Sequence, residues 1–132
     1  MTVNITEIRV RYCECDPMGV VHHTVYPVWF EMGRTELLRM TGVSYRELEE
    51  AGVLLAVVRL EARYRQPARY DEVLQLETSL ATVGRVKVEH TYRLLRGEEL
   101  LVTGATTLAC LDKTGQARLL PDLLLAPQSD PG

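Results

Sequence analysis

A short stretch near the start of the chain gathers side chains that could do chemistry. Residues 11–26 read RYCECDPMGVVHHTVY and include two thiols, two carboxylates and two histidines. Side chains of these types can form a metal centre, a cysteine nucleophile with a partner base, or a carboxylate that activates water. Their spacing, and the elements that must position them, separate these alternatives.

The spacing disfavours a zinc site. Cys13 and Cys15 are separated by one residue, whereas the usual zinc knuckle places roughly two to four residues between its cysteines. His22 and His23, if extended, would point in opposite directions. We therefore expect no metal, and we interpret the two thiols as small buried hydrophobic side chains near the end of the first strand.

A cysteine nucleophile is also disfavoured. Cys13 or Cys15 would need a base such as His23 or His90, and no recognised local signature surrounds either thiol. His90 falls on an alternating strand pattern. We expect it to be a core or interface histidine with its hydrogen bonds satisfied.

Asp16 is the carboxylate with the most suggestive surroundings. It precedes Pro17 and Gly19 in a loop that leads into a helix, and unpaired N–H groups at a helix N-terminus stabilise developing negative charge. A carboxylate that faces such an oxyanion site is suited to hydrolysis. Spacing alone nevertheless favours a simple Asx turn at Asp16. For His23, at the same helix start, a site role and a backbone-bonded surface role are equally consistent with the spacing.

Hydrophobic periodicity predicts the elements that would hold this loop. Alternating residues predict strands over 5–12, 53–67, 74–80, 86–94 and 99–111, and 116–120 could add a short edge piece. Helical spacing predicts a helix over 24–41, capped by Thr24, with Pro27 in its first turn and Gly42 as a left-handed stop. Ser44 and Glu47 form a capping box for a second, short helix.

The fold class predicted from this order is α+β. The sheet must bury its apolar face, and the helix over 24–41 is the only large apolar partner, so the sheet should curl around it. The helix should be buried on most sides, and Glu31 within it should pair with Arg34 or Arg63 or face a cleft. We expect one domain over 1–125 and a flexible tail over 126–132.

Composition excludes some classes of function. A net charge of -3 gives no electrostatic case for a nucleic-acid partner. The sequence has neither a signal-peptide pattern nor an apolar run long enough for a membrane span, so we expect a cytoplasmic protein. The three cysteines cannot all pair with one another, which favours reduced thiols.

Residues 12–38, which include the loop and most of the helix, resemble the signature of hotdog-fold acyl-CoA thioesterases. The most similar group is the 4-hydroxybenzoyl-CoA thioesterase family and its YbgC-like branch, and residues 58–72 resemble a second stretch of it. The resemblance covers most of 8–112. It implies a long central helix wrapped by a five-stranded antiparallel sheet, and a homo-oligomer in which dimers join sheets edge to edge and often form tetramers, with active sites between subunits.

The same resemblance assigns catalytic roles. It implies that Asp16 acts as general base or nucleophile on the thioester, that backbone N–H groups near His23 polarise the carbonyl, and that Tyr12 and His23 line the site. Val25 and His22 depart from residues common in the family, which affects positioning and acyl preference.

Substrate contacts follow from the same resemblance. We expect Gly19, Val20 and Tyr26 to contact the substrate. Its coenzyme A phosphates need cations, for which the candidates are Arg59, Arg65, Arg85 and Lys87. No separate cofactor is expected, because coenzyme A is part of the substrate.

The function we predict is hydrolysis of a small or medium acyl-CoA. A hotdog dehydratase is the nearest enzymatic rival, but its usual histidine motifs do not occur in the sequence. A non-catalytic acyl-CoA sensor belongs to a different class of function. A thioesterase acting on acyl carrier protein stays open as a third alternative.

Overall fold

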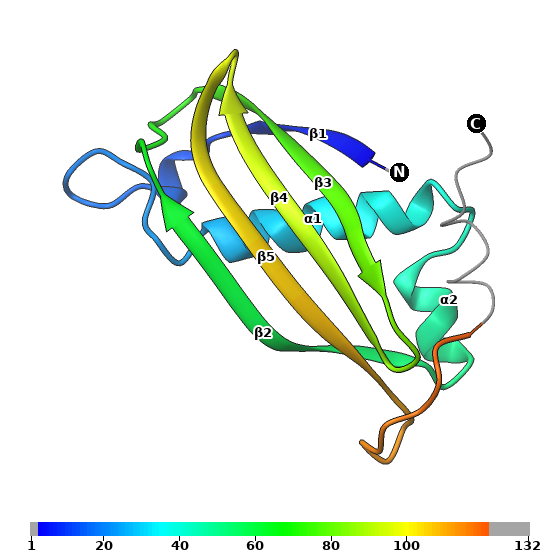
Figure 1. Ribbon diagram of the computed structural model, residues 1–132. Helices are drawn as coiled ribbons and strands as arrows, with labels where there is room; N and C mark the ends of the chain where they lie inside the picture. The colour runs from blue at the N-terminus through cyan, green and yellow to red at the C-terminus, as the bar shows by residue number, and fades with distance from the viewer. Residues whose placement is uncertain (1–2, 122–132) are drawn as a thin grey trace.

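The computed structural model describes residues 3–121 of the chain. A single antiparallel sheet with strand order β1-β3-β4-β5-β2 wraps around the long helix α1 (Figure 1). This confirms the predicted α+β architecture of five strands around a central helix. The strands are β1 (Val3–Arg9), β2 (Leu54–Tyr64), β3 (Val73–Val83), β4 (Lys87–Arg96) and β5 (Glu99–Leu111). The helices are the 3-10 turn η1 (Tyr12–Glu14), α1 (Tyr26–Arg39) and α2 (Tyr45–Glu50).

The ends of α1 agree only in part with the prediction. Pro27 lies in the first turn, as expected, and Gly42 follows the helix with φ of 87°. The predicted cap at Thr24 is wrong, because the Thr24 hydroxyl is hydrogen-bonded to Nδ1 of His22 at 2.7 Å. The N-cap residue is Val25, which makes no side-chain cap. The backbone between 23 and 25 is therefore a turn rather than the first turn of the helix.

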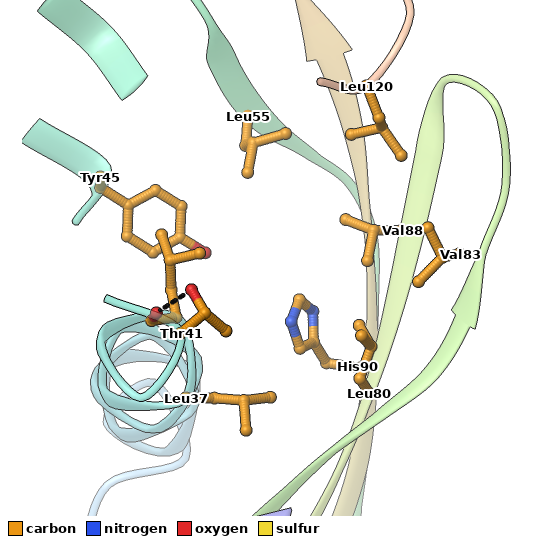
Figure 2. A pocket seen from close by; sticks show the side chains of 10 residues that line it. Leu37, Thr41, Tyr45, Leu55, Leu80, Val83, Val88, His90 and Leu120 are labelled. Carbon is orange, nitrogen blue, oxygen red and sulfur yellow. Dashed lines mark hydrogen bonds between the residues drawn. The ribbon is translucent and has the colours of Figure 1, made fainter. Parts of the chain in front are cut away.

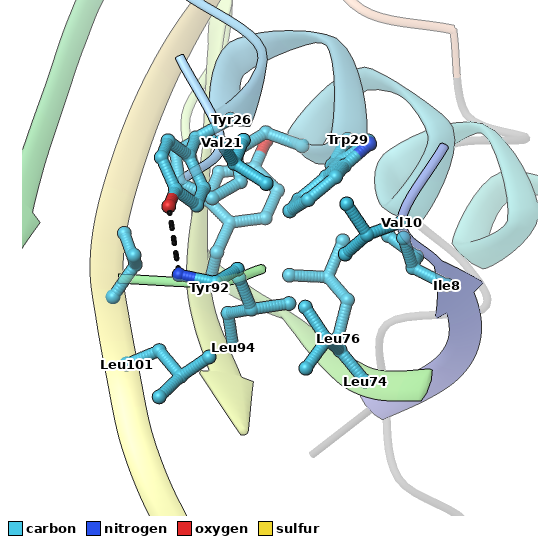
Figure 3. Packing of buried hydrophobic residues seen from close by; sticks show 13 residues of the cluster. Ile8, Val10, Val21, Tyr26, Trp29, Leu74, Leu76, Tyr92, Leu94 and Leu101 are labelled. Atoms are coloured by element: carbon cyan, nitrogen blue, oxygen red, sulfur yellow. Dashed lines mark hydrogen bonds between the residues drawn. The ribbon is translucent and has the colours of Figure 1, made fainter. Parts of the chain in front are cut away.

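One face of α1 forms the main core with the concave face of the sheet (Figure 3). Trp29 and Phe30 are almost fully buried, and the Phe30 ring stacks on Tyr92 of β4 with centroids 4.3 Å apart. The opposite side of α1 is open, since Val28 and Met32 are 51% and 44% exposed. The expectation that the helix is buried on most sides is therefore wrong for the single chain.

Glu31 makes the predicted ion pair with Arg34, at 3.7 Å. The carboxylate is the exposed partner, and the arginine side chain is the buried one.

The edge strand β2 also leaves apolar side chains uncovered. Val58, Leu60 and Tyr64, which the alternating pattern placed on one apolar face, are about half exposed, at 55%, 46% and 52%. By contrast, the alternate residues of the inner strand β4, from Val88 to Leu94, are buried. Periodicity predicted both strands correctly, but only the position of a strand in the sheet decides whether its apolar face is covered.

A second, smaller cluster lies where α2 and the following chain pack against the far end of the sheet. Its residues are Leu38, Val43, Leu48, Val53, Val88, Leu108, Cys110 and Leu120. Ser44 caps α2 by accepting from the Glu47 amide at 3.2 Å, as the capping box predicted.

Three smaller predictions concern the ends of the fold. The first strand ends at Arg9 rather than at residue 12, because the chain turns into η1. Residues 116–120 make one isolated bridge, from Ala117 to Leu111, instead of a strand. The predicted tail over 126–132 lies outside the described residues. None of the helices within 3–121 is long and apolar enough to cross a membrane.

Candidate active site

The loop between β1 and α1 folds back on itself and presents Asp16. Cys15 and Val21 form an antiparallel bridge, and the Asp16 amide donates to the Val20 carbonyl at 2.8 Å. Gly19 closes the turn with φ of 81°, a left-handed conformation that glycine adopts without steric cost. Asp16 is thereby held on one arm of a tight loop whose other arm leads directly to His23.

Asp16 does form the Asx turn that spacing alone favoured. Its Oδ1 accepts from the Met18 amide at 2.9 Å. The residue also lines a cavity at the start of α1. The turn therefore orients the carboxylate, and it leaves the side chain available at the cavity wall.

The cavity brings together residues from three separate segments. It has a volume of about 320 Å³, near the lower end of the range for ligand sites. Five predicted site residues line it, namely Asp16, Val20, His23, Tyr26 and Arg65. The other lining residues, which the sequence reasoning missed, are Val21, Tyr64, Gln66 and Pro67.

Tyr64 is the most informative of the missed residues. Its hydroxyl donates to the His23 carbonyl at 3.2 Å, and its ring lies 5.3 Å from that of Tyr26. The Tyr26 hydroxyl accepts from the Ala68 amide at 3.4 Å, and burial raises the pKa of that phenol. The sequence did contain one signal for Tyr64: it stands at the end of β2, shortly before Pro67, where a side chain can reach the loop.

The turn over residues 23–25, just before α1, supplies a candidate backbone donor at this cavity. The His22 amide donates to the Glu14 carbonyl at 2.9 Å, but within residues 3–121 the His23 amide has no assigned acceptor. The side chain of His22 is turned to Thr24, and its ring lies 4.4 Å from the ring of His23. The His23 amide belongs to the turn just before α1, and His23 lines the same cavity as Asp16; a backbone N–H in such a place has the chemistry of an oxyanion site.

The predicted phosphate-binding cations do not gather at one place. Arg65 lines the cavity, and Arg59 is paired with Glu61 at 2.9 Å. Arg85 and Lys87 lie at the β3–β4 turn. Lys87 is the strand partner of Ala109 in β5, whereas Tyr64, at the cavity end of β2, is the strand partner of Val102 in β5. Within one chain the β3–β4 turn is at the opposite end of the sheet from the loop between β1 and α1 (Figure 1). The role of Arg85 and Lys87 stays a prediction that requires a second subunit.

Tyr12 does not line the cavity within the single chain. Its side chain is 79% exposed, and it contacts Tyr70 edge to face at 5.5 Å. The end of β1 at Arg9 explains this position, since η1 turns the Tyr12 side chain outward.

The thiols differ from their predicted environment. Cys13 is exposed and Cys15 is partly buried, so the interpretation as buried hydrophobic side chains is wrong for Cys13. Partial burial and then the Glu14 carboxylate raise the pKa of the Cys15 thiol, which disfavours the thiolate that a nucleophile needs. Among residues 3–121, no group of three or more His, Cys, Asp or Glu side chains is placed to hold a metal ion.

A second cavity lies at the other end of α1, between α1, α2 and the sheet. His90 projects into it among apolar side chains (Figure 2), and its Nδ1 is buried without an assigned hydrogen-bond partner within 3–121. His90 is therefore a core residue, as predicted, but the expectation that its hydrogen bonds are satisfied within 3–121 is wrong for Nδ1. Burial, and then the charge of Arg34, lower the pKa of His90 to about 4. The cavity encloses about 40 Å³, too little for an acyl group but enough for a few water molecules.

Comparison with known proteins agrees with this geometry. The model of the thioesterase-like superfamily matches residues 10–127. The acyl-CoA thioester hydrolase YbgC of Escherichia coli is 31% identical over 121 residues, which are 90% of each chain. The acyl-CoA thioesterase YbgC of Haemophilus influenzae is 34% identical over 80% of this chain and 78% of its own.

A solved structure gives the same result for the fold. The DHNA-CoA thioesterase of Staphylococcus aureus superposes with a TM-score of 0.91 at 32% identity, over 96% of this chain and 89% of its own. The resemblance seen in residues 12–38 and 58–72 is thus confirmed over most of the chain, and the protein belongs to the thioesterase-like superfamily of hotdog-fold thioester hydrolases.

Proposed function

We propose that the protein hydrolyses a small or medium acyl-CoA to the free acid and coenzyme A at the cavity beside the start of α1. The observation that carries this proposal is that Asp16 and His23 both line that cavity, and that within residues 3–121 the His23 amide has no assigned acceptor. A carboxylate base and a backbone donor at one cavity suit hydrolysis of a thioester, because the base activates water and the donor stabilises the oxyanion. Relatives named as acyl-CoA thioesterases support the substrate class.

In the proposed mechanism, Asp16 removes a proton from water as that water attacks the thioester carbon, or attacks the carbon itself. The carbonyl oxygen becomes an oxyanion, which accepts a hydrogen bond from the His23 amide and is stabilised by the α1 dipole. Collapse of the tetrahedral intermediate breaks the C–S bond, and coenzyme A leaves as a thiolate, which takes up the proton that Asp16 removed from water. Where Asp16 attacks the carbon itself, the collapse leaves a mixed anhydride of Asp16 and the acid, and water then hydrolyses this anhydride to the free acid. The His23 side chain orients the substrate or donates a hydrogen bond.

The cavity walls favour particular substrate contacts. Val20, Tyr26 and Tyr64 offer apolar and aromatic surface to the acyl group, and Gly19 lets the loop turn tightly beside it. Arg65 lines the cavity, and its charge supports a contact with a coenzyme A phosphate.

The test is thiol release from a panel of acyl-CoA substrates by wild type and by Asp16→Asn. The asparagine keeps the shape and can still accept from the Met18 amide, so folding should be unchanged while turnover falls by roughly 10²- to 10⁴-fold. Asp112→Asn is the matched control, because Asp112 also holds an Asx-type turn, accepting from the Thr114 amide at 2.9 Å. Near wild-type turnover in Asp16→Asn would end the Asp16 hypothesis.

The panel should contain acetyl, medium-chain and aromatic acyl-CoAs together with acyl carrier protein thioesters. Faster turnover of the carrier-protein thioesters would replace the acyl-CoA assignment. Binding of acyl-CoA without thiol release from any substrate would identify a sensor instead of an enzyme.

A further inference from the structure

Glu14 is a buried carboxylate inside the catalytic loop that the proposed mechanism does not use. It ends the 3-10 turn η1, two residues before Asp16, and is only 6% exposed. A carboxylate is costly to bury unless donors surround it. Its oxygens therefore need partners, and the identity of those partners indicates what the residue does.

The donors come from both sides of the loop. Oε1 accepts from the Arg11 amide at 2.7 Å, and Oε2 accepts from the indole N–H of Trp29 at 3.0 Å. The exposed Arg11 guanidinium adds a weaker contact to Oε2 at 3.3 Å. Trp29 belongs to α1 and is almost fully buried. The Glu14 carboxylate therefore links the backbone at Arg11, just after β1, to the Trp29 side chain of α1.

The backbone of Glu14 holds the other arm of the loop. Its carbonyl accepts from the His22 amide at 2.9 Å, and the next residue, Cys15, forms the bridge to Val21. Asp16 follows Glu14 by two residues, and His23 follows His22 directly. Asp16 is therefore two residues from Glu14, and His23 is next to the residue whose amide donates to the Glu14 carbonyl.

We propose that Glu14 is a positioning residue that fixes the Asp16 carboxylate relative to the backbone donors at the start of α1. This inference rests on the proposed function. Misplacement of a catalytic group by about 1 Å can cost roughly 10²-fold in rate, and a buried carboxylate hydrogen-bonded to α1 can limit such a displacement. Glu14 is not among the residues that line the cavity, so we expect its replacement to change the rate and not the substrate affinity.

The decisive variant is Glu14→Gln. A glutamine has one acceptor oxygen where the carboxylate has two, so it can accept from the Arg11 amide or from the Trp29 indole but not from both in the same way. We expect kcat to fall by roughly 10- to 100-fold and KM to stay within about threefold of wild type. Wild-type kcat, or a loss that appears only in KM, would overturn the proposal.

A second variant approaches the same hydrogen bond from the helix. Trp29→Phe removes the indole donor and keeps an aromatic ring in the core, so it should lower kcat in the same direction even if Glu14→Gln folds poorly. The two changes should be less than additive in the double variant, because both remove one interaction. Additive losses in kcat, or full kcat in Trp29→Phe, would overturn the proposal.

Lost stability must be distinguished from lost positioning. Leu108→Ala, in the second cluster at the other end of α1, should leave a cavity in the core and lower the urea concentration at the midpoint of unfolding. We expect it to keep wild-type kcat at a temperature where it is folded. A kcat loss in Leu108→Ala as large as that in Glu14→Gln would make the Glu14 effect structural and refute positioning.

An inactive Asp16→Asn beside a fully active Glu14→Gln would refute positioning alone, whereas an active Asp16→Asn would refute the proposed function.

Discussion

Gly33 of α1 faces Thr78 of β3 with no room for a side chain between them. A Cβ at position 33 would overlap Oγ1 of Thr78 and lie 2.8 Å from Cδ2 of Leu76. Thr78 is fully buried, and its hydroxyl has no assigned partner within 3–121. The absence of a side chain at Gly33 therefore allows the helix to lie directly on the sheet, and this contact sets the depth at which α1 presents its N-terminus to the cavity.

Gly33→Ala should destabilise the protein despite the better helix propensity of alanine. The propensity gain is about 1 kcal/mol, and overpacking costs typically 1–3 kcal/mol. We expect a net loss in the free energy of unfolding, measured in urea. Adding Thr78→Ala removes the overlapping hydroxyl and should recover part of the loss. A Gly33→Ala variant more stable than wild type would show that the helix can move away at no cost.

His90 should make the protein less stable as the pH falls below neutrality. Its folded pKa of about 4 lies below the ordinary histidine value of 6.5, so between these two pH values the unfolded chain binds a proton that the folded chain does not. Stability from the neutral histidine is fully present above about pH 6.5 and is lost as the pH falls towards 4. We expect this group to reduce the free energy of unfolding by about 2 kcal/mol between pH 7 and pH 5.

The control for this pH dependence is His90→Phe, which cannot bind a proton and keeps a ring beside Tyr92. Urea unfolding of both proteins at pH 7 and pH 5 separates the contribution of His90 to the change in unfolding free energy from the contributions of the carboxylates and the other histidines. Equal losses in the two proteins would show that His90 is not desolvated in solution.

The apolar edge of β2 should mediate self-association. Val58 is about half exposed on this edge strand, beside the register shift between Val57 and Arg59, and a charged residue on an edge blocks strand pairing. We expect Val58→Lys to shift the mass measured by light scattering towards the monomer and to reduce turnover, because the resemblance places sites between subunits. Ile5→Lys on the other edge strand, β1, is the matched control and should leave the mass unchanged. The reverse pattern would assign the interface to β1.

Arg65 should bind the phosphates of coenzyme A more than Arg59 does, because Arg65 lines the cavity and Arg59 is paired with Glu61. Arg65→Gln should raise KM roughly fivefold at unchanged kcat, and Arg59→Gln should have little effect. The difference should vanish with an acyl-pantetheine, which lacks the nucleotide phosphates. A joint Arg85→Gln and Lys87→Gln variant should raise KM only if a second subunit brings that turn to the site.

Local sequence determined which segments became helices and strands. Alternation predicted every strand, and the Ser44–Glu47 box and Gly42 predicted the start of α2 and the end of α1. The family could be predicted as well, because residues 12–38 carry a local sequence pattern that resembles it, and the match over residues 10–127 confirms this membership. These features depend on interactions between residues close in the chain, and a single sequence contains that information.

The tertiary structure alone decided which side chains share a surface. Tyr64 reaches His23 across 41 positions, and Trp29 reaches Glu14 across 15, and neither contact has a periodic signal. The exposure of the β2 apolar face depends on the edge position of that strand, and the unpartnered nitrogen of His90 depends on how three elements pack around it. Long-range packing fixes these properties, because burial and pairing depend on neighbours that local periodicity does not identify.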